Sequence, residues 1–222
     1  MRAAALLVLL LGPATAWARP KQILFFTKAS GNIHAVIKQV DGKPSVAETV
    51  LGQLASKNGW EVTHSKDGRL FTPEGIARYD GFVFYTIGDL TTAGEDKNPP
   101  MPPGGKELLI ESVRKGKGFV GLHIASDTFL TPGDRFVANG DATDPYLKML
   151  GGEFIWHGPQ QKGRAFCVDA RFPGFADCQD SFEWMEEWYS LKNFQPDLHV
   201  LLWMGTWSVI NTGRGSVYRR PP

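Results

Sequence analysis

The sequence has almost no excess of one charge, few cysteines and only one long apolar run. Its 222 residues include 24 Lys and Arg against 23 Asp and Glu, a formal net charge of +1. This balance gives no general electrostatic attraction to nucleic acid or to anionic membranes. Hydrophobic residues make up 42% and charged residues 21%, which excludes a largely disordered or collagen-like chain. We expect one domain, because this length supports one stable core.

The only two cysteines, Cys167 and Cys178, lie close together in the sequence. A bridge between them is possible in an exported protein, and it would constrain the unfolded chain. Two buried thiols are the equal alternative, because the sequence does not show whether the two Cβ atoms face each other. We leave both alternatives open at this point.

The longest apolar run lies at the start of the chain. Arg2 precedes apolar residues 3–11, and Ala16-Trp17-Ala18 offers a cleavage site between small residues. This three-part pattern is typical of a secretory signal peptide, and the run is shorter than the about 20 residues that span a bilayer. We predict a signal peptide over residues 1–18 and a single domain over residues 19–222. The domain would then be exported to the periplasm or the cell exterior, without a membrane segment. An uncleaved anchor or a buried N-terminal segment is the alternative.

Strand and helix patterns alternate along the next hundred residues. Apolar runs predict strands at 22–27, 60–64, 81–86 and 118–122, and helices are expected from His34, from Ser45, over 72–79 and over 106–115. Ser45 and Glu48 form a capping box, and Val46, Val50 and Leu54 would form the buried face of that helix. The alternation predicts an α/β fold with a parallel sheet, in which ligands bind beyond the carboxyl ends of the strands.

Polar groups that can carry chemistry follow several of these strands. His34 comes after the first strand, His123 directly after the fourth, and His157 lies further along between glycine and proline residues. Together with Glu187, these histidines predict either a divalent metal site, for example for zinc, or a metal-free acid–base site. Each residue alone could instead be a solvated turn residue. His64 and His199 lie in or beside apparent strands, and we interpret them as structural.

Aromatic residues accompany the acidic pair Glu186-Glu187. Trp184 and Trp188 have faces suited to stacking on the C–H surface of a sugar ring. They could equally belong to the core, which is the more common place for tryptophan.

The run Gly116-Lys117-Gly118-Phe119-Val120-Gly121-Leu122-His123-Ile124-Ala125-Ser126-Asp127-Thr128 closely resembles the signature of ThuA-like proteins, the trehalose-utilisation family. Other pieces agree in the same order: Gly31-Asn32-Ile33-His34, Tyr79-Asp80-Gly81, the run from Met149 to Phe154, and Glu186-Glu187-Trp188-Tyr189. The resemblance extends over most of residues 21–203.

The resemblance implies the fold of class I glutamine amidotransferases, an α/β three-layer sandwich with a mainly parallel, flavodoxin-like central sheet. It does not imply their activity. Those enzymes have a cysteine at the turn where this chain has His123, and an imidazole cannot form the thioester of glutamine hydrolysis. Neither cysteine of this chain is placed to substitute.

The resemblance also implies a carbohydrate substrate, in particular a glycoside or disaccharide oxidised to a keto sugar. The catalytic residues would be His123, Glu187 and His34, and the substrate contacts Trp188, Tyr189 and Asp127. A divalent metal, if present, would bind His34, His123, His157 and Glu187. The alternatives are a noncatalytic carbohydrate-binding or accessory module, and a structural exported domain. The sequence leaves the oligomeric state open.

The C-terminal residues depart from the family pattern. Relatives continue through a further strand, whereas this chain ends in a run from Asn211 to Pro222 that only partly matches it. This suggests a sheet that lacks its last strand, in a degenerate or truncated C-terminus. Because a missing strand exposes a sheet edge, we expect lower stability than in a full-length relative.

Overall fold

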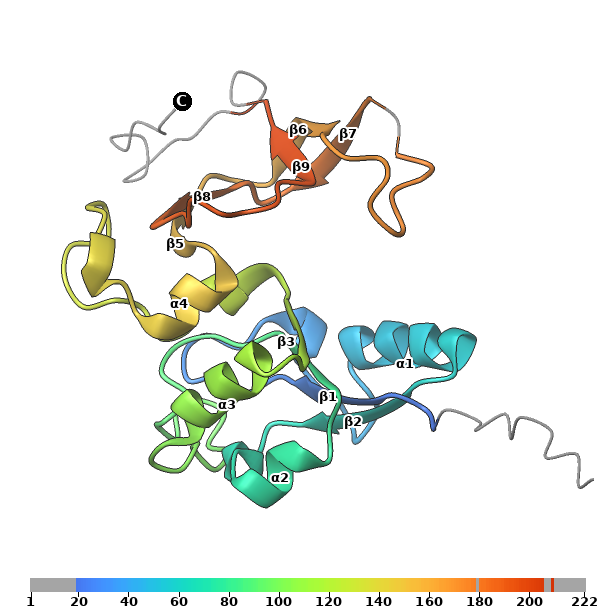
Figure 1. Cartoon of the computed structure of the whole chain (residues 1–222), viewed down its shortest axis with the longest axis vertical. Helices are drawn as coiled ribbons and strands as arrows, with labels where there is room; N and C mark the ends of the chain where they lie inside the picture. Colours follow the sequence, from blue (N-terminus) through green and yellow to red (C-terminus); the bar gives the residue numbers. More distant parts are fainter. Residues whose placement is uncertain (1–18, 179, 206–208, 210–222) are drawn as a thin grey trace, which may run out of the picture.

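Figure 1 shows the computed structural model of the chain, which describes residues 19–178, 180–205 and 209. The predicted signal peptide over residues 1–18 and the departing tail at 211–222 lie outside these described residues. Within them, no helix is long and apolar enough to cross a membrane.

Four parallel strands form the central sheet, and they lie where the apolar runs predict them. They are β1 (Gln22–Phe26), β2 (Glu61–Ser65), β3 (Gly81–Phe84) and β4 (Gly118–Gly121). Their order is β2-β1-β3-β4, and every neighbouring pair is parallel. The predicted α/β class with a flavodoxin-like sheet is therefore confirmed.

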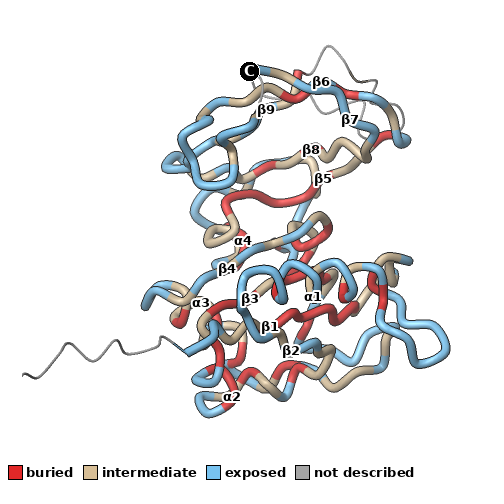
Figure 2. The backbone as a smooth tube through the Cα atoms, turned by 90° about the vertical axis from the view of Figure 1, so that its right-hand side faces the viewer, coloured by how far each residue is buried: buried red, intermediate tan, exposed pale blue. Residues whose placement is uncertain are grey.

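Helices cover both faces of this sheet, which gives three layers (Figure 1). Leu24 and Phe26 of β1 point to one face, where they pack with α2 (Pro73–Ala77), α3 (Gly105–Arg114) and α4 (Pro145–Leu150). Phe25 points to the opposite face, toward α1 (Val46–Asn58). The buried residues concentrate in this sheet and its flanking layers (Figure 2). Successive side chains of a strand alternate between faces, so an almost continuous apolar run suits a strand that is covered twice.

Helix α1 has the predicted ends but not the predicted buried face. The side chain of Ser45 accepts a hydrogen bond from the Glu48 backbone, and the carboxylate of Glu48 accepts one from the Ser45 backbone. Gly59 ends the helix in the left-handed conformation. However, the prediction of a buried Val46, Val50 and Leu54 face is wrong, because these side chains are 64%, 49% and 48% exposed. The face that packs on Phe25 lies one residue further along, and it comprises Ala47 and Leu51.

The helix expected from His34 is only a short turn. It forms the 3-10 helix η1 (Ala35–Ile37), which is followed by extended backbone at Lys38. Three further short turns are η2 (Gly68–Leu70), η3 (His123–Asp127) and η4 (Gly140–Ala142). The turn η1 still buries Ile37 beside α1, so it caps the same face of the sheet.

Two antiparallel groups of strands follow the parallel sheet, and Figures 1 and 2 show them stacked beyond it. The first pairs β5 (Glu153–His157) with β8 (Tyr189–Lys192). The second has the order β7-β6-β9, with β6 (Gln161–Cys167), β7 (Ser181–Glu186) and β9 (Leu202–Met204). Cys167 and Cys178 are free, partly exposed thiols, which differs from both the bridge and the two buried thiols considered from the sequence.

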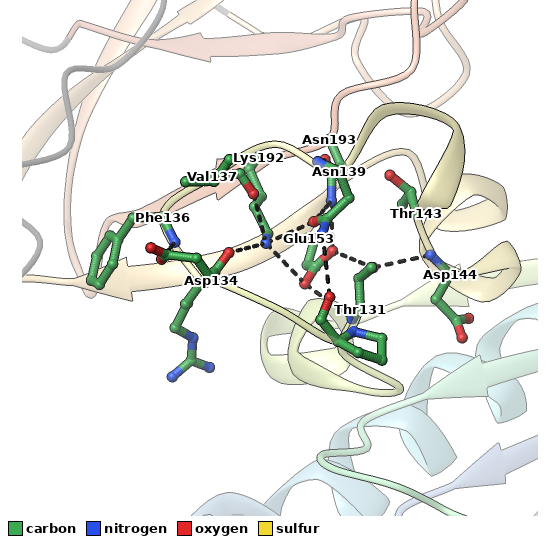
Figure 3. A network of polar contacts seen from close by, with 12 residues as sticks. Thr131, Asp134, Phe136, Val137, Asn139, Thr143, Asp144, Glu153, Lys192 and Asn193 are labelled. Atoms are coloured by element: carbon green, nitrogen blue, oxygen red, sulfur yellow. Dashed lines mark hydrogen bonds and ion pairs between the residues drawn. The ribbon is translucent and has the colours of Figure 1, made fainter.

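A buried polar network joins the β5–β8 pair to the preceding loop (Figure 3). Lys192 donates to the carbonyls of Asp134 and Val137 and to the side chain of Asn139, at 2.9–3.1 Å. Its Nζ lies 3.6 Å from Glu153 Oε1, and both side chains are at most 2% exposed. Glu153 in turn accepts hydrogen bonds from Thr131 and Asn193. Each buried charge therefore has several partners, as a charge removed from water requires.

We predict that Lys192→Met destabilises the protein by about 3–5 kcal/mol, because it leaves Glu153 as a buried charge without its cation. The measurement is urea unfolding. Arg114→Ala is the control, since Arg114 pairs with Glu111 on the exposed surface of α3 and its loss should leave the transition unchanged. Equal transitions for wild type and Lys192→Met would contradict the role of the network.

We also predict opposite outcomes for two neighbouring leucines of α1. Leu51→Ala removes packing against the sheet and should cost about 1–2 kcal/mol, whereas Leu54→Ala on the exposed face should change stability by less than about 0.5 kcal/mol. Urea unfolding of both variants measures the difference. A larger loss of stability for Leu54→Ala than for Leu51→Ala would contradict this packing and support the buried face expected from the sequence.

Candidate functional site

The candidate site lies at the carboxyl ends of β3 and β4, where β8 packs against them. His123 follows β4 by two residues and begins η3. Its φ is +48°, in the left-handed region that non-glycine residues rarely adopt. The surrounding structure holds this conformation: Leu122 N–H donates to the Phe84 carbonyl at 2.8 Å, and Tyr146 O–H donates to the Ala125 carbonyl at 3.2 Å. Strain held in this way concentrates at functional sites.

His123 contacts two groups from the β7–β8 segment. Its Nε2 lies 2.8 Å from the hydroxyl of Tyr189 and 3.6 Å from Glu187 Oε2. The rings of His123 and Tyr189 are 4.6 Å apart. The side chains of His123 and Glu187 are 24% and 27% exposed, so a solute can reach them although most of their surface is covered.

His157 reaches the same carboxylate from the end of β5. Its Nδ1 lies 2.7 Å from the Gly158 carbonyl, an acceptor, which assigns the hydrogen to Nδ1. Its Nε2 lies 3.8 Å from Glu187 Oε2. The ring stacks on Tyr189 with an interplanar angle of 21°, so Tyr189 lies between His123 and His157.

His34 approaches from the loop after β1. Its ring lies 5.2 Å from that of His123, edge to face, and its Nδ1 is 3.4 Å from the hydroxyl of Tyr85. Tyr85 directly follows β3 and also packs 5.7 Å from His123. The loops after β1 and β3 come very close: a Cβ on Gly88, whose φ is +78°, would lie 3.2 Å from the Gly31 backbone.

The protein lowers the pKa of two of these histidines. Burial is the main cause for both His34 and His123, because it penalises the imidazolium cation. The neighbouring histidines add to the lowering, whereas the carboxylate of Glu187 opposes it. Both rings are therefore neutral near pH 7 and can accept a proton.

The two tyrosines are held as neutral phenols. Burial, followed by the charges of Glu186 and Glu187, raises the pKa of Tyr85 to about 12. Burial and Glu187 also raise the pKa of Tyr189. At neutral pH the site thus combines proton acceptors, His34 and His123, with proton donors on the tyrosine hydroxyls.

A cavity of about 300 Å³ opens beside His123 and Tyr189, with Ser126 as a further polar group and apolar side chains from α4 and the segment 191–198 around it. Within the ranges that the structure describes, no group of three or more His, Cys, Asp or Glu side chains is arranged to hold a metal ion. The Nε2 of His123 faces the hydroxyl of Tyr189 instead. The predicted ligand set of His34, His123, His157 and Glu187 therefore comes together as a cluster but does not fit a metal.

The remaining predicted site residues have other partners. Asp127 binds the Arg135 guanidinium at 2.7 Å, although burial raises the pKa of Asp127 to about 6. Trp188 donates from Nε1 to the Gln161 carbonyl at 2.9 Å, on the side of β6. Trp188 and Trp184 line a second cavity and not the one beside His123. His64 packs edge-on against Phe25, and His199 pairs with Asp169.

Sequence reasoning missed two residues of this site. Tyr85 continues the apolar third strand, and its position at the strand end was the only available signal. Arg135 lies in the long loop before α4, and its carbon Cζ sits 5.2 Å above the ring of Phe154, which packs on Tyr189. No sequence pattern marks this loop position.

A family model and one solved structure agree with this architecture. The family model described as ThuA, trehalose utilisation, matches residues 22–215. A crystal structure of a ThuA-like protein from Bacteroides uniformis has a TM-score of 0.58 at 17% identity, and the match covers 91% of this chain and 78% of that one. A ThuA-like protein from Parabacteroides merdae has a TM-score of 0.47 at 17% identity, over 80% of this chain and 64% of that one. No curated protein matches the chain.

We predict that His123 titrates below the usual histidine value of about 6.5 and that Glu187→Gln lowers its pKa further. The reason is that the carboxylate favours the imidazolium, so its removal disfavours the protonated ring. NMR titration of the ring nitrogens measures both effects. Glu183→Gln, which removes an exposed carboxylate paired with Arg164, is the control and should leave the titration unchanged. A rise in the pKa of His123 in Glu187→Gln would contradict the arrangement.

Proposed function

Because this chain belongs to the ThuA family of trehalose utilisation, we propose that it acts on an oxidised glycoside or disaccharide by acid–base chemistry. The observation that carries the proposal is the cluster of His34, His123 and His157 with Tyr189 at the carboxyl end of the sheet. Residues 1–18 have the pattern of a secretory signal peptide, and we therefore further propose that the protein works after export.

A keto sugar suits these groups chemically. The C–H bond beside the carbonyl is acidic, and neutral His123 removes its proton while the electron pair moves into an enediolate. When substrate enters, the Tyr189 hydroxyl leaves His123 Nε2, which frees this nitrogen to act as the base. The hydroxyls of Tyr189 and Tyr85 then donate hydrogen bonds to the oxygen on which the negative charge develops. Such donors act on the transition state and lower the barrier to proton removal.

The proton can then complete an elimination. The carbonyl of the enediolate re-forms, and its electron pair makes a double bond to the neighbouring carbon while the bond from that carbon to the glycosidic oxygen breaks. The departing oxygen takes the proton from the His123 imidazolium. Atoms and charge balance without an oxidant. Glu187, 3.6 Å from His123 Nε2 and 3.8 Å from His157 Nε2, compensates the transient positive charge and orients both rings. His34 packs edge-on against His123 and provides a second neutral base beside it.

Glutamine hydrolysis does not suit the same site. The turn after β4 presents an imidazole at His123, where a thiolate nucleophile would be needed. Cys167 ends β6 and Cys178 follows in the next loop, so neither lies at that turn. A hydrogen bond between Cys167 and Cys178, followed by burial, raises the pKa of Cys167 to about 11, which disfavours its thiolate.

The test is proton exchange into deuterated water at the carbon beside the carbonyl of a keto-disaccharide, followed by NMR, together with release of free sugar. We expect His123→Ala to lower the rate by about 10²–10⁴-fold, the usual contribution of a general base. His199→Ala is the matched control, because His199 pairs with Asp169 on the surface. The acid limb of the rate profile should lie below pH 6.5, because the pKa of His123 is lowered.

Two results would overturn the proposal. Saturable sugar binding without exchange would identify a noncatalytic carbohydrate-binding module. Exchange that persists in His123→Ala would move the base elsewhere in the cluster.

A further inference from the structure

A second cavity lies on the three-stranded sheet β7-β6-β9 and takes no part in the chemistry above. It measures about 420 Å³, within the usual range for small-molecule sites. Its walls are mostly large and apolar: Phe182, Trp184, Trp188, Leu202, Trp203 and Met204. Ala165 and Glu186 complete the lining, and we call this set the aromatic groove.

The strand register explains why the sheet is hollow at this point. Ala165 lies opposite Phe182, and Gly163 opposite Trp184, so two small residues of β6 lie opposite two large residues of β7. A Cβ on Gly163 would meet the Trp188 ring at 2.4 Å, so only glycine lets this indole lie flat on the strand. The hydrogen bond from Trp188 Nε1 to Gln161 then fixes the ring. The groove therefore has a rigid aromatic wall before any ligand arrives.

The groove adjoins the acid–base cluster along the sequence. Glu186 lines the groove, and Glu187, the next residue, lies beside His123 and His157. Glu186 Oε1 accepts a hydrogen bond from the Glu187 backbone at 2.8 Å, which holds the Glu186 carboxylate against the backbone of Glu187. The charge of Glu186 also acts on Tyr85, His123 and Tyr189, so the carboxylate that lines the groove lies near the acid–base cluster.

The chemistry of the lining selects the kind of ligand. Aromatic faces suit a flat apolar C–H surface, and a carboxylate suits neighbouring hydroxyl groups. A pyranose ring offers both, with axial C–H bonds on its faces and hydroxyls around its rim. Trp184 is 59% exposed, so its face is available for such stacking.

We propose that the aromatic groove binds the second, unoxidised pyranose ring of a disaccharide whose oxidised ring lies at His123. This inference rests on the proposed function for the identity of the first ring. Trp184 stacks on the second ring, Trp188 supports it from the side, and Glu186 accepts hydrogen bonds from its hydroxyls. The groove thus selects a disaccharide over a single sugar.

Isothermal titration calorimetry of the full chain with trehalose tests the groove without any turnover. We expect saturable binding that weakens at least tenfold in Trp184→Ala and is largely restored in Trp184→Phe, which keeps an aromatic face. Trp60→Ala is the matched control, because Trp60 is also an exposed tryptophan but lies before β2, at the opposite edge of the parallel sheet. It should bind trehalose as the wild type does.

Each other outcome overturns the inference. Absence of saturable heat in the wild type, or equal affinity of Trp184→Ala and wild type, would exclude a sugar site in the groove. Concentration-dependent dimerisation that is lost in Trp184→Ala, measured by light scattering, would show that a second copy covers it. Because trehalose is not oxidised, binding in this assay is separable from exchange on the keto sugar. Failure of one assay therefore does not imply failure of the other.

Discussion

The buried ion pair between Glu153 and Lys192 holds β5 against β8, and half of the candidate site is built on this pair of strands. The two residues face each other across β5 and β8, and in the same ladder His157 faces Tyr189. A slip of one residue would turn every side chain of a strand to its other face. It would also bury two charges without partners, which is costly. The pair, with its satisfied hydrogen bonds to the loop, therefore fixes one end of the ladder, and a register shift between Phe154 and Trp156 then brings His157 opposite Tyr189 at the other end.

The parallel sheet supplies the other half of the site. His34, Tyr85 and His123 follow β1, β3 and β4, and the carboxyl ends of parallel strands meet at one edge. The hydrogen bond between His123 and Tyr189 joins the two halves. A cluster assembled from separate elements has a useful electrostatic property: partial burial keeps His34 and His123 neutral and the tyrosines protonated. Glu187 then provides the only negative charge within 4 Å of both His123 and His157 among the described residues.

Local features of the sequence anticipated the parallel sheet well. Short, almost continuous apolar runs leave few alternatives to a doubly covered strand, and the Ser45–Glu48 capping box with Gly59 marks both ends of α1. The buried face of α1 was predicted wrongly, because two apolar stripes run side by side along it. Val46, Val50 and Leu54 form one stripe, and Ala47 and Leu51 the adjacent one. The choice between them depends on how the helix packs on Phe25, which no local pattern contains.

The sequence by itself determined the four parallel strands, the turn at His123 and the residue types of the site, because these depend on neighbours along the chain. It also carried the resemblance to the trehalose-utilisation family, which the family match bears out. Only the tertiary structure decided which residues meet. It placed Tyr85 and Tyr189 between the histidines, gave Asp127 to Arg135, and turned Trp188 toward β6. The physical reason is that these contacts join residues 27 to 66 positions apart or depend on a loop conformation, and the packing of whole elements sets both.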